Sequence, residues 1–199
     1  MKSVFKSGVL ALAAAALPAA AYAHTGVGET AGLVHGFSHP VSGLDHILAM
    51  VMVGVLAFQL GGRAVWAVPA TFVLVMAFGG ALGMAGINVP FVETGIALSV
   101  IVLGAVVAFN VKAPLAAALG VVGLFAIFHG HAHGAEMPEN ATGAAYAAGF
   151  MIATALLHVA GLALGYVVGR AGERQGAFVT RAAGGIAALS GIVILAGLI

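Results

Sequence analysis

The segment Ala64–Ala85 has the sequence AVWAVPATFVLVMAFGGALGMA and contains no charged side chain. As a helix rising about 1.5 Å per residue, it is long enough to cross the roughly 30 Å hydrocarbon core of a membrane. Five other apolar segments of similar length are separated by short breaks of glycine, proline and charged residues. Because a backbone in lipid must satisfy its own hydrogen bonds, these segments predict six transmembrane helices. The segments are Pro40–Gln59, Ala64–Ala85, Phe91–Asn110, Pro114–His131, Gly143–Gly169 and Ala177–Leu198.

The composition leads to the same fold class. The chain is 62% hydrophobic and only 7% charged, whereas soluble domains carry about 25% charged residues. It has no cysteine, which excludes disulfides and thiolate metal sites. The net charge of +1 and the lack of a basic patch give no indication of nucleic-acid binding. We predict an all-α integral membrane protein in which residues 24–199 form a single six-helix transmembrane domain.

Residues 1–23 have the pattern of a cleavable signal peptide. Lys2 and Lys6 provide the positive start, Gly8–Leu17 is a short apolar core, and the sequence AYA at 21–23 is a small-x-small cleavage site. We therefore expect His24 to become the mature N-terminus. There it either chelates a metal through its amine and imidazole or forms a frayed end.

The charged residues predict an orientation, because positive residues accumulate on the cytoplasmic side of a membrane. Outside the signal peptide, the basic residues follow the first, third and fifth apolar segments, with Arg181 just inside the start of the sixth, and the acidic residues lie towards the opposite edge, with Glu173 as the exception. We expect a bacterial inner-membrane protein whose mature N-terminus and C-terminus are both periplasmic. The basic residues are Arg63, Lys112, Arg170, Arg174 and Arg181.

Six of the eight histidines lie in two short clusters at the expected periplasmic edge. The first is HGFSHPVSGLDH at His35–His46, and the second is FHGHAHGAE at Phe128–Glu136. Polar side chains at membrane depth are costly, so their presence indicates a function. Imidazole and carboxylate ligands without thiolate suit Ni²⁺, Co²⁺, Zn²⁺, Fe²⁺ or Mn²⁺. The pattern therefore favours a pathway for a divalent metal ion.

In the first cluster, Pro40 suits the first turn of a helix. A helix that begins there places His39 at its mouth and His46, seven residues further on, on the same face. Asp45 then either ligates the metal directly or orients a histidine ring through its second nitrogen. The alternative is a structural Asp–His hydrogen bond at a helix start, where a negative charge is favourable in any case.

In the second cluster, His129 and His133 are four residues apart and share a face if the helix continues through them. His131 then points to the other side. His133 and Glu136 are three residues apart, so that both side chains can reach one ion. The alternative is an exposed histidine-rich loop that only binds stray cations.

Two residues outside the clusters are candidates as well. Glu93 opens the third segment on the same side and either completes the metal site or is an ordinary acid near a helix start. His158 lies inside the fifth segment and is expected to point into the helix bundle. It is either a lower station on the pathway or a buried neutral histidine bonded to a neighbour.

The strings HPVSGLDHILAM at 39–50 and FHGHAHGAE at 128–136 resemble the HPxxGxDHxLAM and FHGxAHGxE signatures of the HupE/UreJ family at every fixed position. The resemblance also covers the signal peptide and the six segments. It implies a secondary permease with Ni²⁺, or Co²⁺, as the transported ion, no catalytic cofactor, and a link to hydrogenase or urease maturation. The residues that it implies are most needed for transport are His39, Asp45, His46, His133 and Glu136, with Glu93 as a helper.

Two other classes of function stay open at this point. A membrane accessory protein would bind nickel at the outer face without moving it. A membrane metalloenzyme or haem protein fits less well, because HExxH is absent and only His158 lies deep in a segment. No Walker A pattern exists either, so the chain carries no ATPase of its own. Membrane lipid is the other expected partner, and a homo-oligomer is one option for the assembly.

Overall fold

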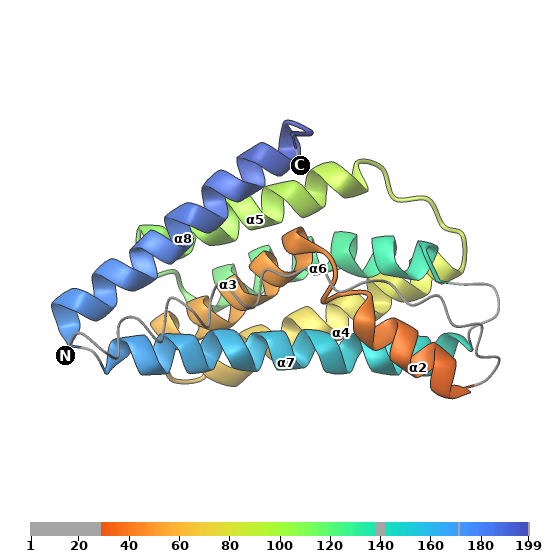
Figure 1. Cartoon of the computed structure of the whole chain (residues 1–199), viewed down its shortest axis with the longest axis horizontal. Helices are drawn as coiled ribbons and strands as arrows, with labels where there is room; N and C mark the ends of the chain where they lie inside the picture. The colour runs from red at the N-terminus through yellow and green to blue at the C-terminus, as the bar shows by residue number, and fades with distance from the viewer. Residues whose placement is uncertain (1–28, 138–141, 171, 199) are drawn as a thin grey trace.

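The computed structural model describes residues 29–137, 142–170 and 172–198, and these residues form α-helices and no strands (Figure 1). The all-helical architecture is therefore confirmed. The predicted signal peptide and His24 lie outside the described residues. The helices are α2 (Glu29–Ser38), α3 (Leu44–Leu60), α4 (Ala64–Met84), α5 (Val92–Ala108), α6 (Leu115–Ala135), α7 (Gly143–Gly169) and α8 (Glu173–Leu195).

Four of these helices, α4, α6, α7 and α8, are long and apolar enough to cross a membrane. This agrees with the membrane protein that the composition predicts. Helices α3 and α5 are also apolar but contain 17 residues each, which is the lower end of the usual transmembrane range of about 17–25 residues. Six membrane spans therefore remain a prediction.

The first predicted helix begins later than the sequence suggests. Pro40 does not start it: α3 begins at Leu44, and the separate helix α2 precedes it. Proline disfavours the helical conformation of the residue before it, which ends α2 before His39. Both the backbone nitrogen and the hydroxyl of Ser42 then donate to the carbonyl oxygen of His39, at 3.1 and 2.7 Å, and Gly43 is extended. His39 thus lies in a turn outside α3 and does not share a helical face with His46.

Two other boundaries also differ from those predicted. Helix α6 continues to Ala135, beyond the expected end at His131, and α8 begins at Glu173, before the expected start at Ala177. The continuation of α6 keeps the second histidine cluster helical throughout.

The helices pack in pairs around α3. Helix α4 lies against α6, α5 against α8, and α7 against both α2 and α3. Figure 1 shows α8 beside α5 along one edge of the molecule and α2 against the start of α7. Helix α3 also contacts α4 and α5, and its residues Met50, Val53 and Ala57 are completely buried. This central place brings His46, in the first turn of α3, close to α6 and α7.

Glycines allow α4 and α6 to approach each other closely. A Cβ atom at Gly130 of α6 would collide with the carbonyl oxygen of Met76, and one at Gly134 would collide with that of Gly80. Such contacts matter in lipid, because no hydrophobic force drives the helices together there. Close backbone packing stabilises the helix pair instead. They fix the rotation of α6, and therefore the direction of its histidines.

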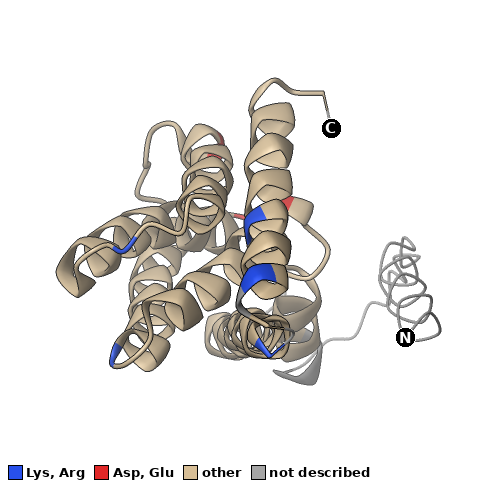
Figure 2. Ribbon diagram, turned by 90° about the vertical axis from the view of Figure 1, so that its left-hand side faces the viewer, with Lys and Arg blue, Asp and Glu red and all other residues tan. Residues whose placement is uncertain are grey.

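Most basic and acidic residues lie at opposite ends of the helices, with Glu173 at the start of α8 as the exception. The connections α3–α4, α5–α6 and α7–α8 contain Arg63, Lys112 and Arg170, and Figure 2 looks onto this end of the molecule. The acidic residues at the start of α3, the start of α5 and the end of α6 are Asp45, Glu93 and Glu136. The orientation of these two ends in a membrane remains a prediction.

We expect the variant Gly130→Ala to be less stable than the wild-type protein by about 1–3 kcal/mol, because the new methyl group forces α4 and α6 apart. Gly120 is the matched control on α6, since a Cβ atom there meets nothing within 4 Å. Gly120→Ala should change the stability by no more than about 1 kcal/mol. Thermal unfolding of both variants in detergent measures the difference, and equal stabilities would contradict the close α4–α6 contact.

Candidate metal site

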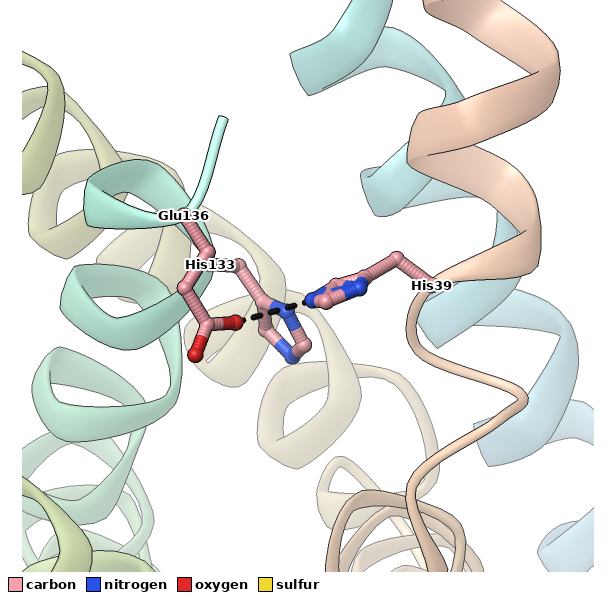
Figure 3. Close-up of side chains that lie close together, drawn as sticks. All are labelled: His39, His133 and Glu136. Carbon is pink, nitrogen blue, oxygen red and sulfur yellow. Dashed lines mark hydrogen bonds and ion pairs between the residues drawn. The ribbon is translucent and has the colours of Figure 1, made fainter. Parts of the chain in front are cut away.

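The turn between α2 and α3 lies against the end of α6. Nε2 of His39 is 2.9 Å from Oε2 of Glu136, which directly follows α6. The rings of His39 and His133 meet edge to face, with their centroids 4.9 Å apart. Figure 3 shows the three side chains turned towards one another from the two segments. The sequence motifs, far apart in the chain, therefore meet in space.

His39, His133 and Glu136 have the geometry of a metal-binding group. Each offers one ligand atom, and the three atoms all lie within 4.8 Å of one another. Within the described ranges, this is the one group of three histidine or acidic residues with that geometry. The side chain of Glu136 is 57% exposed and that of His39 is 29% exposed, so the group is open to solvent. Two imidazoles and a carboxylate suit a borderline divalent cation.

A second set of imidazoles continues from this outer group into the protein. Nδ1 of His46 lies 3.1 Å from Nε2 of His133 and 3.2 Å from Nδ1 of His129. A first-row dication bound by imidazoles at about 2.1 Å holds neighbouring nitrogens roughly 3.0–3.4 Å apart. Two of the three pairs have this spacing, whereas the three residues together do not meet the 4.8 Å condition that the outer group meets. His133 therefore belongs both to the outer group and to this inner trio of His46, His129 and His133.

The hydroxyl of Ser99 decides which nitrogen of His129 carries the hydrogen. Ser99 donates its only hydrogen to the carbonyl oxygen of Ile96, at 2.6 Å. The same oxygen lies 2.8 Å from Nε2 of His129 and must therefore accept from it. Nδ1 of a neutral His129 consequently has a free lone pair, and this lone pair faces His46.

The ring nitrogens of the inner trio then carry too few hydrogens to form hydrogen bonds at both of its nitrogen–nitrogen contacts. A hydrogen on Nδ1 of His46 or on Nε2 of His133 can occupy the space between these two atoms, but hydrogens on both would collide. At least two of the three facing nitrogens therefore present lone pairs. Free lone pairs on neighbouring buried imidazoles can bind a metal cation, since the neutral imidazole is the ligating form. The far nitrogen of His46, Nε2, contacts the hydroxyl of Thr154 at 3.2 Å.

All seven residues predicted from the sequence line one cavity of about 190 Å³. They come from the α2–α3 turn and from α3, α5 and α6. Asp45 and Glu93 also line a larger neighbouring cavity of about 450 Å³ between α3, α5 and α8. The seven residues are His39, Asp45, His46, Glu93, His129, His133 and Glu136.

Asp45 has a local role besides lining the cavity. Its Oδ1 accepts a hydrogen bond of 2.7 Å from the backbone nitrogen of His46, in the first turn of α3. This is an Asp–His hydrogen bond at a helix start, as in the structural alternative that the sequence left open, with the backbone of His46 as the donor. The carboxylate is only half-buried and still borders the cavity.

His131 points away from the cavity, as the helical spacing predicts. Its Nε2 lies 2.7 Å from the carbonyl oxygen of Ile87, in the connection between α4 and α5. His131 therefore ties a loop to α6 and stands apart from the other two histidines of its cluster.

Sequence reasoning missed Ser99 and Thr154, the two hydroxyl groups that hold the inner trio. Both are completely buried. Each is an isolated polar residue in an apolar helix, and that signal could have identified them. Two aromatic rings that pack on the trio were missed as well. Phe150 lies 4.6 Å from His133 and Phe72 lies 5.7 Å from His129, centroid to centroid, and an aromatic residue in an apolar segment gives no comparable signal.

Comparison with known proteins agrees with the motifs. The family model described as "HupE / UreJ protein" matches residues 11–194. Protein HupE of Rhizobium leguminosarum bv. viciae is 53% identical over 187 residues, which cover 94% of this chain and 95% of that protein. No solved structure matches the chain significantly. The family is of the transporter type, without known enzymes, and is linked to nickel handling for hydrogenase and urease. The chain therefore belongs to the HupE/UreJ family, which is associated with nickel and cobalt transport.

Proposed function

We propose that this protein is a secondary permease that imports Ni²⁺, with Co²⁺ as the alternative ion, across the bacterial inner membrane. In this proposal residues 24–199 form one six-span domain after cleavage of the signal peptide, and the ion supplies hydrogenase or urease maturation. The observation that carries the proposal is the single cavity lined by four histidines and three carboxylates from distant segments.

The ion is captured first by the outer group of His39, His133 and Glu136, which is open to solvent. It then moves to the inner trio by exchanging ligands. His133 contacts both sets, so the ion keeps one imidazole while it changes the others. Asp45 and Glu93, at the border of the two cavities, attract the cation to the entrance. This order of steps avoids the high cost of releasing a bare dication in an apolar region.

The membrane potential can drive the movement. An inside-negative potential contributes about 2.3 kcal/mol per charge per 100 mV, and therefore about twice that for a divalent cation. With the histidine clusters on the periplasmic side, the ion moves down this potential towards the basic end of the protein. Nucleotide hydrolysis is then not required, in agreement with the lack of a Walker A pattern.

We expect His46→Ala to lower ⁶³Ni²⁺ uptake into liposomes at least about tenfold, because His46 joins His133 to His129 within the inner trio. His131→Ala is the matched control, since His131 contacts a loop carbonyl and lies outside the cavity. Its uptake per folded protein should stay close to that of the wild type. Equal uptake by His46→Ala and wild type would contradict the pathway. A wild-type protein that binds ⁶³Ni²⁺ without taking it up would instead be an accessory protein.

The affinity for ⁶³Ni²⁺ should also depend on pH, because His39 binds the ion only in its neutral form. Burial lowers the pKa of His39 below its ordinary value of 6.5, although the carboxylate of Glu136 opposes this shift and His35 adds to it. The neutral, ligating ring therefore persists to a lower pH than in an exposed histidine. We expect ⁶³Ni²⁺ affinity to be constant from about pH 8 to about pH 6.5 and to weaken below it, as protons displace the ion.

Equilibrium dialysis of the purified protein against ⁶³Ni²⁺ over this pH range measures the effect. The control His39→Ala should bind more weakly at every pH and lose less of its affinity on acidification. A wild-type affinity that already falls between about pH 8 and pH 7 would contradict this role of His39.

A further inference from the structure

His131 and His158 are buried histidines outside the cavity of the proposed site, and of the two only His131 has a hydrogen-bond partner among the described residues. His158 is only 1% exposed, and neither of its ring nitrogens has a hydrogen-bond partner among the described residues. It borders a cavity of about 400 Å³ between α4 and α7, and all the other residues that line this cavity are apolar. No acid, hydroxyl or amide there stabilises the ring. The sequence analysis offered a hydrogen bond from a neutral His158 to a neighbour as one alternative, and no such partner is found among the described residues.

His158 continues the line of groups that hold the inner trio. Phe150, Thr154 and His158 are spaced by four residues and share one face of α7. The ring of Phe150 contacts His133, and the hydroxyl of Thr154 contacts His46. His158 follows one turn later, near the middle of this 27-residue helix.

The ring of Phe72 on α4 connects His158 to the trio from another side. Its centroid lies 5.7 Å from that of His129 and 5.3 Å from that of His158. The two histidines therefore pack against the same completely buried phenyl ring. An ion that leaves His129 past this ring reaches His158.

A structural role does not explain this imidazole. Buried polar groups are nearly always hydrogen-bonded, and leaving one unpaired destabilises the folded state. A leucine or phenylalanine would fill the same space without that cost. The two unpaired ring nitrogens are explained, however, if the imidazole binds a cation during transport.

We propose that His158 is a second binding station for the transported dication, deeper in the protein than the cavity of the inner trio. This inference rests on the proposed function. A single imidazole binds a cation more weakly than a group of three ligands. Weak binding is what a transit station requires, because conduction depends on release. His158 thus takes the ion from His129 and passes it on towards the basic end of the protein.

The test compares uptake, binding and stability in His158→Leu and wild type. We expect ⁶³Ni²⁺ uptake into liposomes to fall at least about fivefold, while equilibrium binding of ⁶³Ni²⁺ in detergent changes by less than about twofold. The thermal midpoint should stay equal or rise, because an unpaired polar group is removed. His131→Leu is the matched control, since it removes a buried histidine that does have a partner. It should lower the thermal midpoint and keep its uptake per folded protein.

A second pair of variants separates ligation from packing, and it remains informative if the leucine variant does not fold. His158→Cys and His158→Ser are similar in size, but only the thiolate is a strong metal ligand. The chain has no other cysteine to confuse the comparison. We expect the cysteine variant to transport ⁶³Ni²⁺ at least about threefold faster than the serine variant.

The outcomes separate this inference from the proposed function. The second station alone would be overturned if the wild type takes up ⁶³Ni²⁺, His46→Ala does not, and His158→Leu reduces the uptake by less than about fivefold. Equal uptake by the cysteine and serine variants would overturn it too. No uptake by the wild type would overturn both proposals.

Discussion

The 2.9 Å contact between Nε2 of His39 and Oε2 of Glu136 joins two segments that are 97 residues apart in the chain. A pair as exposed as this one contributes only about 0–1 kcal/mol to the folded state, so it does not hold the bundle together. The backbone packing of α2 on α7 and of α6 on α4 brings the two residues together instead. On α2, a Cβ atom at Gly36 would collide with the carbonyl oxygen of Tyr146, just as one at Gly130 would collide with that of Met76. Glycines therefore position candidate ligands that they do not contact.

The character of the candidate ligands changes with depth. The outer group contains a carboxylate, which attracts a dication from water. The inner trio contains imidazoles only, and its other described hydrogen-bond partners are the hydroxyl groups of Ser99 and Thr154. On the proposed pathway, a cation that moves inward would exchange a charged ligand for neutral ones in an apolar surrounding. In the proposed pathway such a change of ligands would favour release, because conduction requires binding that is weak enough for the ion to leave.

Much of the fold and of the candidate site follows from local patterns in the sequence. The helical period predicts that His129 and His133 share a face and that His131 turns away, and α6 has this arrangement. The same reasoning was wrong for His39, because Pro40 also affects the residue before it and ends α2 there. Helix α2 itself was missed, since it is too short and too polar to match a membrane span.

The helical period shows which residues share a face of one helix, but it does not show which other helix packs against that face. The contact of His46 with His129 joins residues 83 positions apart and depends on how α3, α4 and α6 pack. The motifs suggested that the two clusters meet, but only because both contain metal-ligand residues at the same end. Ser99 and Thr154 form their contacts across α5–α6 and α3–α7, and a sequence read one helix at a time gives no distances of this kind.

X-ray absorption spectroscopy of the nickel-loaded protein counts the ligand atoms around the ion and therefore shows whether the histidines bind it. We expect at least two imidazole rings around Ni²⁺ in the wild type, and one ring fewer in His133→Ala. An ion surrounded by oxygen atoms alone, or a spectrum that His133→Ala leaves unchanged, would contradict this expectation.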